Sequence, residues 1–346
     1  MRYRLFGEHT GLRVSEVVLG TGVFGTRWGY GSDPAESRRI IDAYADAGGN
    51  FIDTANVYEA GESEEIIGAA VQGRRDDFVV ATKYTGPGGA KNGILTTGNS
   101  RKAMTVSVED SLKRLKIDYI DLLWVHFADG VTPAEEIVRG FDDLVRAGKV
   151  LYAGLSDFPA WRVARAVTIA ELRGAAPIAG LQFEHSLVER TSEYDVIPAG
   201  RALGLGMVAW SPLGGGLLTG KYRQGESGRK EGWGGQVFQQ ENSAQRTKIV
   251  DTVIEIAREL NVNNGEVAIA WVAAKGSQVI IGPRTFSQLE SNLAAAKLKL
   301  SPEHIARLDD VSAIPSIFPH GVLESARPLY TGGKPDLFDA PAGTVA

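Results

Sequence analysis

Eight short apolar segments, separated by stretches with a helical pattern, constrain the fold of this chain more than any other feature. They are VVLG (17–20), FIDTA (51–55), FVVATK (78–83), IDLLWVH (120–126), LYAGLS (151–156), AGLQFE (179–184), GMVAWS (206–211) and QVIIG (278–282). Their nearly continuous apolar character is typical of parallel strands that helices cover on both faces. Eight strand–helix units predict a single α/β domain, a (β/α)₈ TIM barrel, rather than an open doubly wound sheet.

Helix-start signals lie between the apolar segments. DPAE at 33–36 offers an N-cap, a proline at the first helical position and a capping-box glutamate, and TPAE at 132–135 repeats the signal. Residues at helical spacing then predict the buried faces. They are Ile40, Ile41, Tyr44 and Ala47 in one helix and Val108, Leu112 and Leu115 in another.

The two ends of the chain and one internal stretch fall outside this pattern. Residues 3–14 predict a β-hairpin around a His-Thr-Gly turn that closes the bottom of the barrel. The glycine-rich stretch 222–246 predicts a long loop, and 313–346 an irregular C-terminal tail of the single domain 1–346. Apolar residues in this tail indicate that it packs against something: Phe318, Leu323, Tyr330 and Phe338.

Composition excludes several classes of partner. The net charge of −5, without a basic stripe, disfavours nucleic acid and anionic membranes as partners. The start of the chain lacks the apolar region of a signal peptide, and no apolar run is long enough to span a membrane. Cysteine is absent, which excludes disulfides and thiolate chemistry. We therefore expect a cytoplasmic protein that acts on a small molecule, with its oligomeric state open.

Polar residues end three consecutive strands of the predicted barrel. Asp53 ends the second strand with Tyr58 in the loop behind it, Lys83 ends the third and His126 the fourth. Chemistry in this fold gathers at the C-terminal ends of the strands, so these four side chains are expected to converge. Each alone is compatible with a structural ion pair or with packing, but the set on adjacent strands favours a function.

The four residues would form a proton-transfer device. A nearby ammonium group stabilises phenolate and lowers the pKa of a tyrosine, which brings it within reach of general acid–base catalysis. The carboxylate would hold the lysine in place and keep it charged. Histidine can hydrogen-bond to a substrate oxygen and orient it.

The motifs around these residues resemble those of the aldo-keto reductases over residues 1 to 300. They are Asp53-Thr54-Ala55-Asn56-Val57-Tyr58, Ala81-Thr82-Lys83, Ser111-Leu112-Lys113-Arg114-Leu115, Asp118-Tyr119-Ile120-Asp121-Leu122 and Val125-His126. The resemblance implies a catalytic tetrad of Asp53, Tyr58, Lys83 and His126. It also implies a nicotinamide cofactor across the barrel mouth and reversible reduction of an aldehyde or ketone, with Tyr58 as the proton donor.

The same resemblance implies where the nicotinamide end of the cofactor binds. The residues are Gly20, Thr21, Gly22 and Val23 after the first strand, with Asp53, Ser156, Asp157, Gln182 and Trp210. Glycines 20 and 22 would let the backbone approach the ribose, although they could equally be plain turn residues. Trp210 would stack on the ring. Asp157 stands where the family usually has asparagine, and an ionised carboxylate cannot donate a hydrogen bond to the carboxamide oxygen.

The segment SPLGGGLLTGKY (211–222) contains most of a P-loop motif. Tyr222 replaces the required serine or threonine and no helix is predicted to follow, so we exclude a nucleoside triphosphatase. The resemblance implies instead that this backbone wraps the cofactor pyrophosphate, with charge from a lysine. The residues are Ser211, Pro212, Leu213, Gly214, Gly216, Leu218 and Lys221.

The adenosine end is expected at GPRTFSQLESN (282–292), where a helix begins. Helix N-termini attract phosphate, and Arg284 is placed to reach a 2′-phosphate, which favours NADP over NAD. Gly282, Gln288 and Asn292 match the other cofactor positions, and Ser291 stands where many relatives have glutamate.

Several alternatives remain open. The five histidines have no metal-site spacing, so no metal is expected. A regulatory NADPH-binding protein like potassium-channel β-subunits is the main alternative, although these depart from the motif at the position of His126. A Schiff-base aldolase using Lys83 is a third. Aromatic residues predict an apolar substrate mouth, with the tail leaning over it. They are Trp28, Tyr58, His126, Phe127, Phe158 and, less directly, Trp233.

Overall fold

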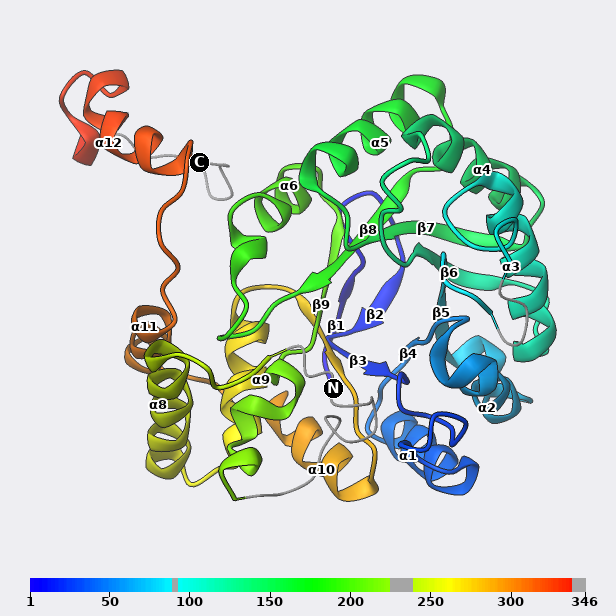
Figure 1. Cartoon of the computed structure of the whole chain (residues 1–346), viewed down its shortest axis with the longest axis horizontal. Helices are drawn as coiled ribbons and strands as arrows, with labels where there is room; N and C mark the ends of the chain where they lie inside the picture. The colour runs from blue at the N-terminus through cyan, green and yellow to red at the C-terminus, as the bar shows by residue number, and fades with distance from the viewer. Residues whose placement is uncertain (89–92, 225–238, 338–346) are drawn as a thin grey trace.

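A closed barrel of eight parallel strands forms the centre of the molecule (Figure 1). The structure is a computed structural model that describes residues 1–88, 93–224 and 239–337. The barrel strands are β3 (Val17–Gly20), β4 (Phe51–Asp53), β5 (Val79–Tyr84), β6 (Ile120–Val125), β7 (Val150–Ser156), β8 (Ile178–Glu184), β9 (Gly206–Trp210) and β10 (Gln278–Ile281). β10 pairs with β3 and closes the ring. The predicted TIM barrel is confirmed, and each apolar segment coincides with one strand, three of which extend one residue beyond it.

Helices surround the barrel and cover its outer face (Figure 1). Before β9 they are α1 (Pro34–Asp46), α2 (Glu62–Val71), α3 (Arg101–Leu115), α4 (Ala134–Arg146), α5 (Ala160–Arg173) and α6 (Val196–Ala202). After β9 they are α8 (Ala244–Leu260), α9 (Asn264–Ala274), α10 (Phe286–Ala295) and α11 (Pro302–Val311), and a last helix, α12 (His320–Tyr330), does not cover the barrel. In the described parts of the chain, no helix is both long and apolar enough to cross a membrane.

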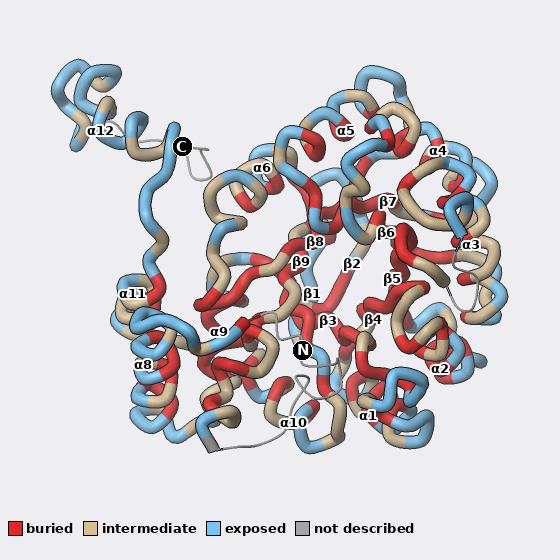
Figure 2. The backbone as a smooth tube through the Cα atoms, viewed as in Figure 1, coloured by how far each residue is buried: buried red, intermediate tan, exposed pale blue. Residues whose placement is uncertain are grey.

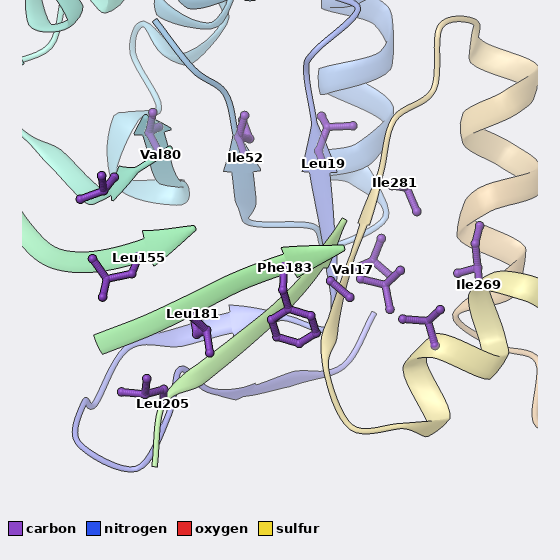
Figure 3. Close-up of a cluster of buried hydrophobic side chains, with 14 of the residues drawn as sticks. Val17, Leu19, Ile52, Val80, Leu155, Leu181, Phe183, Leu205, Ile269 and Ile281 are labelled. Atoms are coloured by element: carbon purple, nitrogen blue, oxygen red, sulfur yellow. The ribbon is translucent and has the colours of Figure 1, made fainter. Parts of the chain in front are cut away.

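Every second residue of each strand points outward and packs under the helices. Leu19, Ile52, Val80 and Leu155 are buried in this outer layer together with Ile269 of α9 (Figure 3). The backbone tube is accordingly buried along the strands and exposed on the outer sides of the helices (Figure 2). Because side chains alternate along a strand, the intervening residues point into the barrel. Both faces are buried, and this explains why the sequence showed continuous apolar runs.

A β-hairpin closes the bottom of the barrel, as predicted. β1 (Tyr3–Leu5) pairs antiparallel with β2 (Arg13–Ser15). Phe6, at the turn, is completely buried and its ring meets Phe51 at 5.7 Å and Trp124 at 6.3 Å between centroids. This inner core fills the lower barrel and leaves the C-terminal ends of the strands for polar residues.

The two predicted helix starts behave differently. Asp33 caps α1 by accepting from the backbone N–H of Glu36 at 2.9 Å, whereas the Glu36 carboxylate accepts from the backbone of Phe286 instead of closing a capping box. Thr132 does not cap α4, because its hydroxyl donates to Asp129 at 2.6 Å. Ala47, expected on the buried face, is the exposed C-cap of α1.

The C-terminal region contradicts the prediction of an irregular tail that packs against the molecule. Residues 320–330 form helix α12, followed by the 3-10 helix η6 (Pro335–Leu337). Phe318, Leu323 and Tyr330 are exposed, and α12 stands away from the barrel (Figures 1 and 2). Phe338 lies outside the described residues. The predicted loop 222–246 is shorter at both ends, since η5 (Lys221–Gln224) and α8 take up its first and last residues.

Candidate active site

Alternation along the strands aims the polar strand-end residues into the barrel mouth. Asp53 lies two residues after the inward-facing Phe51, and Lys83 lies two after Ala81. The register pairs Asp53 with Gly20 on one side and Ala81 on the other. Lys83 therefore lies one inward-facing position beyond the level of Asp53 on the neighbouring strand, from which its amine forms an ion pair with the Asp53 carboxylate.

Lys83 is the centre of this cluster. Its ammonium group is buried and forms an ion pair with Asp53, and it donates to the Thr54 carbonyl at 2.9 Å and to the Tyr58 hydroxyl at 3.3 Å. Burial acts to lower the pKa of Lys83, but the charge of Asp53 and the Tyr58 hydroxyl outweigh it. The pKa consequently lies above its ordinary value and the amine stays protonated.

His126 completes the cluster from the end of β6. Its ring meets the Tyr58 ring edge-on at 5.7 Å between centroids, and its backbone N–H donates to the Tyr84 carbonyl at 2.9 Å. Burial, and next the charge of Lys83, lower its pKa to about 3. The imidazole is therefore neutral at physiological pH. No described group hydrogen-bonds to its buried Nδ1.

A second ion pair supports the cluster from behind. Glu64 of α2 is fully buried, accepts from the Thr82 hydroxyl at 2.6 Å and pairs with Arg114 of α3 at 2.6 Å. Thr82 precedes Lys83 on β5, so this contact ties the strand to two outer helices. The role of Arg114 in the Ser111–Leu115 motif is structural, and Glu64 was not recognised from the sequence.

A cavity of about 880 Å³ opens above these side chains. Asp53, Tyr58 and His126 form part of its wall, while Lys83 lies behind them. Of the other residues predicted to bind cofactor, most also line it: Gly20, Thr21, Gly22, Val23, Ser156, Asp157, Gln182, Trp210, Ser211, Pro212, Leu213, Gly216, Lys221, Gly282, Arg284, Gln288 and Asn292. Cavities of this size hold ligands of several rings.

The end of the cavity near Tyr58 carries groups that suit a carboxamide. The buried Ser156 hydroxyl has no hydrogen-bond partner among the described residues. Gln182 donates to Asp53 at 3.0 Å, and Asp157 accepts from the Trp210 indole N–H at 3.0 Å. Burial raises the pKa of Asp157 to about 6. The hydrogen bond from the indole of Trp210 acts to lower this pKa, whereas the negative charge of Glu184 acts to raise it further.

Gly20 is required for the packing of β3 against β10. A Cβ at this position would lie 2.4 Å from the Cγ2 of Ile280, which already occupies that space. At Gly22 a Cβ would be 3.7 Å from the Tyr58 ring, an ordinary contact. Both glycines line the cavity, and the contact with Ile280 shows in addition that position 20 must be a glycine for β3 to fit against β10.

The opposite end of the cavity is electropositive. Lys221 and Arg284 line it, and the first residues of α9, Asn264 and Gly265, point their helix N-terminus toward it. Arg284 lies 4.5 Å from the centroid of the Tyr30 ring, and no described group accepts from its buried Nε. These features fit a ligand with phosphate groups. Gly214 and Leu218 do not line the cavity, because both are buried in the wall behind it.

Several lining residues were missed by sequence reasoning. They are Tyr30, Thr219, Val262, Asn263, Asn264, Gly265 and Ile280, whereas Ser291 had been noted and Gly215 belongs to the segment expected to wrap the pyrophosphate. Most come from loops and helix starts without a recognisable motif. Asn263 was nevertheless readable as a helix N-cap, since it is followed three residues later by Glu266.

The predicted substrate residues fall into two groups. Phe127 is exposed and lines the cavity next to His126, at 5.4 Å between ring centroids. Phe158 is buried in the outer core, and Trp28 lies outside the cavity on the loop that carries Tyr30, so neither forms its wall. Trp233 lies outside the described residues. The tail also stays clear of the mouth, since none of its described residues lines the cavity.

No cluster that could bind a metal occurs within residues 1–88, 93–224 and 239–337. His185, one of the five histidines, is buried and hydrogen-bonded to Glu193 at 2.8 Å. Its ring lies against Trp271 at 5.2 Å between centroids, which identifies it as a core residue.

A barrel whose strands deliver aspartate, lysine, tyrosine and histidine to a long cavity is the architecture of a barrel oxidoreductase. A sequence model of the aldo/keto reductase family matches residues 16–313, and the chain belongs to that family. It is accordingly an oxidoreductase of the kind that interconverts carbonyl and alcohol groups.

Individual relatives agree with this class. The chain is 37% identical to an aryl-alcohol dehydrogenase [NADP(+)] of Phanerodontia chrysosporium, over 92% of this chain and 88% of the relative. It is 36% identical to a norsolorinic acid reductase of Aspergillus flavus, over 93% and 84% of the two chains. An uncharacterized oxidoreductase of Bacillus subtilis, YrpG, is 39% identical over 90% and 96%.

Proposed function

We propose that this protein reduces an aromatic aldehyde or ketone reversibly to the alcohol, with NADPH as the preferred cofactor and Tyr58 as the proton donor. The observation that carries the proposal is the hydrogen bond from Lys83 to the Tyr58 hydroxyl, 3.3 Å long, at the wall of the cavity. It places a fixed positive charge beside a hydroxyl that can donate a proton to a ligand in the cavity, and this charge would stabilise the phenolate that remains.

The residues divide the work of the reaction. A bound nicotinamide supplies the hydride that reaches the carbonyl carbon. Tyr58 donates its hydroxyl proton to the oxygen that becomes the alcohol, and Lys83 stabilises the phenolate left behind. Asp53 holds Lys83 in its protonated form, and Gln182 fixes Asp53 through the 3.0 Å hydrogen bond. His126, neutral under these conditions, donates one hydrogen bond to the carbonyl oxygen and orients it.

The preference for NADPH rests on Arg284. Its guanidinium group lies over the Tyr30 ring at the cavity wall, and Gln288 and Asn292 of α10 line the same cavity. Arginine binds phosphate through a planar pair of donors, and a 2′-phosphate distinguishes NADP from NAD. A relative named as an NADP(+) enzyme supports the same choice.

An aromatic substrate is favoured by the mouth and by one relative. Tyr58, His126 and Phe127 present aromatic rings around the point where proton transfer would occur. Flat rings of this kind pack against a flat substrate without burying a charge. The name of one relative, an aryl-alcohol dehydrogenase, refers to an aromatic alcohol as well.

The two alternatives are less well supported. An aldolase needs a neutral lysine as nucleophile, whereas the environment of Lys83 raises its pKa and engages its ammonium group in three contacts. A regulatory protein without catalysis does not need His126, which here stands next to Tyr58 and within the cavity wall.

Cofactor titration followed by turnover tests the proposal. Tryptophan fluorescence is titrated with NADPH and with NADH, and then oxidation of NADPH is followed by absorbance with benzaldehyde, butanal and glyoxylate. Quenching that favours NADPH, with fastest turnover of benzaldehyde, is expected. Tight NADPH binding without turnover of any carbonyl would favour the regulatory alternative, and absence of binding of either cofactor would refute the reductase proposal.

A further inference from the structure

A buried asparagine lies behind the segment that carries His126. Asn99 comes just before α3, at the end of the segment that follows β5; it is completely buried and does not line the cavity. β5 pairs with β6, the strand that His126 follows, so Asn99 and His126 come from neighbouring strand ends (Figure 1). The reaction proposed above gives this amide no role, although burying it without a purpose would be costly.

Both ends of the Asn99 amide bind groups beside His126. The Nδ2 group donates to the carbonyl of Phe127 at 2.9 Å, and Oδ1 accepts from the hydroxyl of Thr85 at 2.7 Å. The hydroxyl oxygen of Thr85 accepts in turn from the backbone N–H of His126 at 3.3 Å, an N–H that it shares with the carbonyl of Tyr84. The amide therefore holds the backbone on both sides of the His126 side chain.

These contacts fix the orientation of the amide. If the oxygen and nitrogen of Asn99 were exchanged, its oxygen would face the carbonyl oxygen of Phe127, and two acceptors would meet in a buried place. In the observed orientation the Thr85 hydroxyl donates to Asn99 and keeps its lone pairs for the N–H of His126. An apolar side chain of the same size would leave the Thr85 hydroxyl and the Phe127 carbonyl without this partner.

The backbone of Asn99 is itself anchored at two points. Its N–H donates to the Asp129 carboxylate at 2.9 Å, and its carbonyl accepts from the Tyr84 hydroxyl at 3.3 Å. Asp129 also accepts from the backbone N–H groups of Val131 and Thr132, at 3.1 and 2.9 Å. The segment after β6 is thus closed around the same carboxylate that holds Asn99, so the amide has a rigid base.

Thr85 has a backbone conformation that requires such support. Its φ is 128°, a region that β-branched residues rarely adopt. Strained residues persist where their surroundings fix them, and they are concentrated at functional sites. Thr85 is buried, its carbonyl accepts from the backbone N–H of Gly98 at 2.8 Å, and its hydroxyl donates to Asn99. Residues 98 and 99 therefore hold Thr85 from both its backbone and its side chain.

The imidazole of His126 depends on its backbone for its position. No described group hydrogen-bonds to its buried Nδ1, and its ring meets those of Tyr58 and Phe127 at 5.7 and 5.4 Å between centroids. Aromatic pairs are favourable over centroid distances of about 4.5 to 7 Å, so these contacts alone do not fix the ring within an ångström. A misplacement of about 1 Å is enough to cost roughly 100-fold in rate.

We propose that Asn99 is a positioning residue, whose amide fixes the place of the His126 imidazole in the wall of the active site through Thr85 and the Phe127 carbonyl. The effect on turnover rests on the proposed function, in which His126 orients the substrate carbonyl, whereas the effect on the position of the ring does not. Asn99 touches neither substrate nor cofactor in this scheme and acts through His126.

Nuclear magnetic resonance of the full chain, with ¹³C in the histidine rings, tests the position of the imidazole. The chain has five histidines, and His126→Ala identifies the His126 signal by its loss. Asn99→Leu and Thr85→Val remove the amide and the hydroxyl at similar side-chain volume, and each should shift the His126 signal while the other histidine signals stay in place. Thr85→Ser keeps the hydroxyl and should keep the wild-type signal. An unmoved His126 signal in either Asn99→Leu or Thr85→Val would overturn the proposal.

Asn50→Leu is the matched control. Asn50 bridges two backbone groups in the same way at the bottom of the barrel, since it accepts from the N–H of Ser15 at 2.7 Å and donates to the carbonyl of Arg13 at 3.0 Å. Loss of this bridge should lower the melting temperature as Asn99→Leu does, but leave the His126 signal and turnover as in the wild type. If Asn50→Leu changed both as much as Asn99→Leu, the cause would be general loosening of the barrel, and the proposal would be wrong.

Turnover shows whether Asn99 acts through His126. Asn99→Leu and Thr85→Val should lower kcat for benzaldehyde by about 10- to 100-fold, while the dissociation constant for NADPH stays within about a factor of two to three of wild type. In a chain that already carries His126→Ala, the further change Asn99→Leu should lower kcat by less than about two-fold, because the residue that it positions is absent. Equal losses in both backgrounds would contradict the proposal.

A wild-type chain that binds NADPH and reduces no carbonyl would refute the proposed function alone. The histidine signals need no turnover, and they would then decide whether Asn99 fixes the imidazole of His126.

Discussion

The ammonium group of Lys83 lies 3.3 Å from the hydroxyl of Tyr58, and the two residues reach this position from different strands of the barrel. Lys83 ends β5, whereas Tyr58 follows β4 at the start of the 3-10 helix η1 (Tyr58–Gly61). The next residue, Glu59, has a left-handed backbone with φ of 48°. Its buried carboxylate accepts from the backbone N–H of Trp28 at 2.6 Å, which anchors the turn to the loop after β3.

Tyr58→Phe tests the proton donor. The change removes the hydroxyl and keeps the ring against Gly22 and His126. We expect turnover to fall by about 1,000-fold, in the range for loss of a general acid. The dissociation constant for NADPH, measured by fluorescence, should stay within a factor of two to three of wild type. Full turnover in this variant would show that another group supplies the proton.

Lys83→Met tests the buried ion pair as a stabilising element. The side chains of Lys83 and Asp53 are 1% and 3% exposed, so the variant leaves a buried carboxylate without its counter-charge. We expect a loss of about 3–5 kcal/mol in the free energy of unfolding, measured in urea. Lys113→Met is the matched control. Its side chain is 74% exposed and pairs with Asp110, so its loss should be below about 1 kcal/mol. Equal effects would mean that the Lys83 pair is not structural.

The arrangement of the barrel and of the tetrad followed from local features of the sequence. Each strand is a separate apolar run, and side-chain alternation sends Asp53 and Lys83 to the inside. Ser156 and Gln182, which the resemblance to the aldo-keto reductases indicated, lie opposite each other on β7 and β8. These positions depend on the strand that carries them and on its nearest neighbours, so they were predictable without a structure.

Other features depend on contacts between distant segments and were missed. Tyr30 joins the cavity wall because Arg284, from the far end of the chain, lies against its ring. Phe158 comes two residues after the inward-facing Ser156, yet its ring is buried beside Arg162 because the chain turns at Asp157, where φ is 51°. Pro328 within α12 and the glycines after it made residues 320–330 look irregular, so this helix was missed.

Arg284→Gln tests the choice between cofactors. NADPH and NADH share the pyrophosphate and differ at the 2′-phosphate, so loss of this guanidinium group should weaken only NADPH binding. We expect the dissociation constant for NADPH to rise by about 10- to 100-fold, while that for NADH is unchanged. Lys221→Met is the matched comparison, because a lysine on the pyrophosphate should affect both cofactors alike. If Arg284→Gln weakened the binding of NADPH and NADH equally, the arginine would not bind the 2′-phosphate.

Asp157→Asn tests whether this carboxyl senses the redox state of the cofactor. Burial raises the pKa of Asp157 to about 6, so the group is neutral below that pH and anionic above it. The oxidised nicotinamide ring is positively charged and the reduced ring is neutral. An anion near the ring therefore favours NADP⁺, and the preference for NADP⁺ over NADPH should increase by about 5-fold as the pH rises through 6. Titration with each cofactor on either side of this pH measures the change.

Asparagine at position 157 keeps an oxygen that accepts from the Trp210 indole, so the 3.0 Å contact of the wild type can be retained. It has no titratable proton, and the ratio of the two dissociation constants should no longer depend on pH. Asp110→Asn, on the outer helix α3, is the control and should behave like the wild type. Glu184 is the competing group, because burial raises its pKa as well and it lies near enough to influence Asp157. If the ratio of the two dissociation constants still depended on pH in Asp157→Asn, the titrating group would be Glu184 and not Asp157.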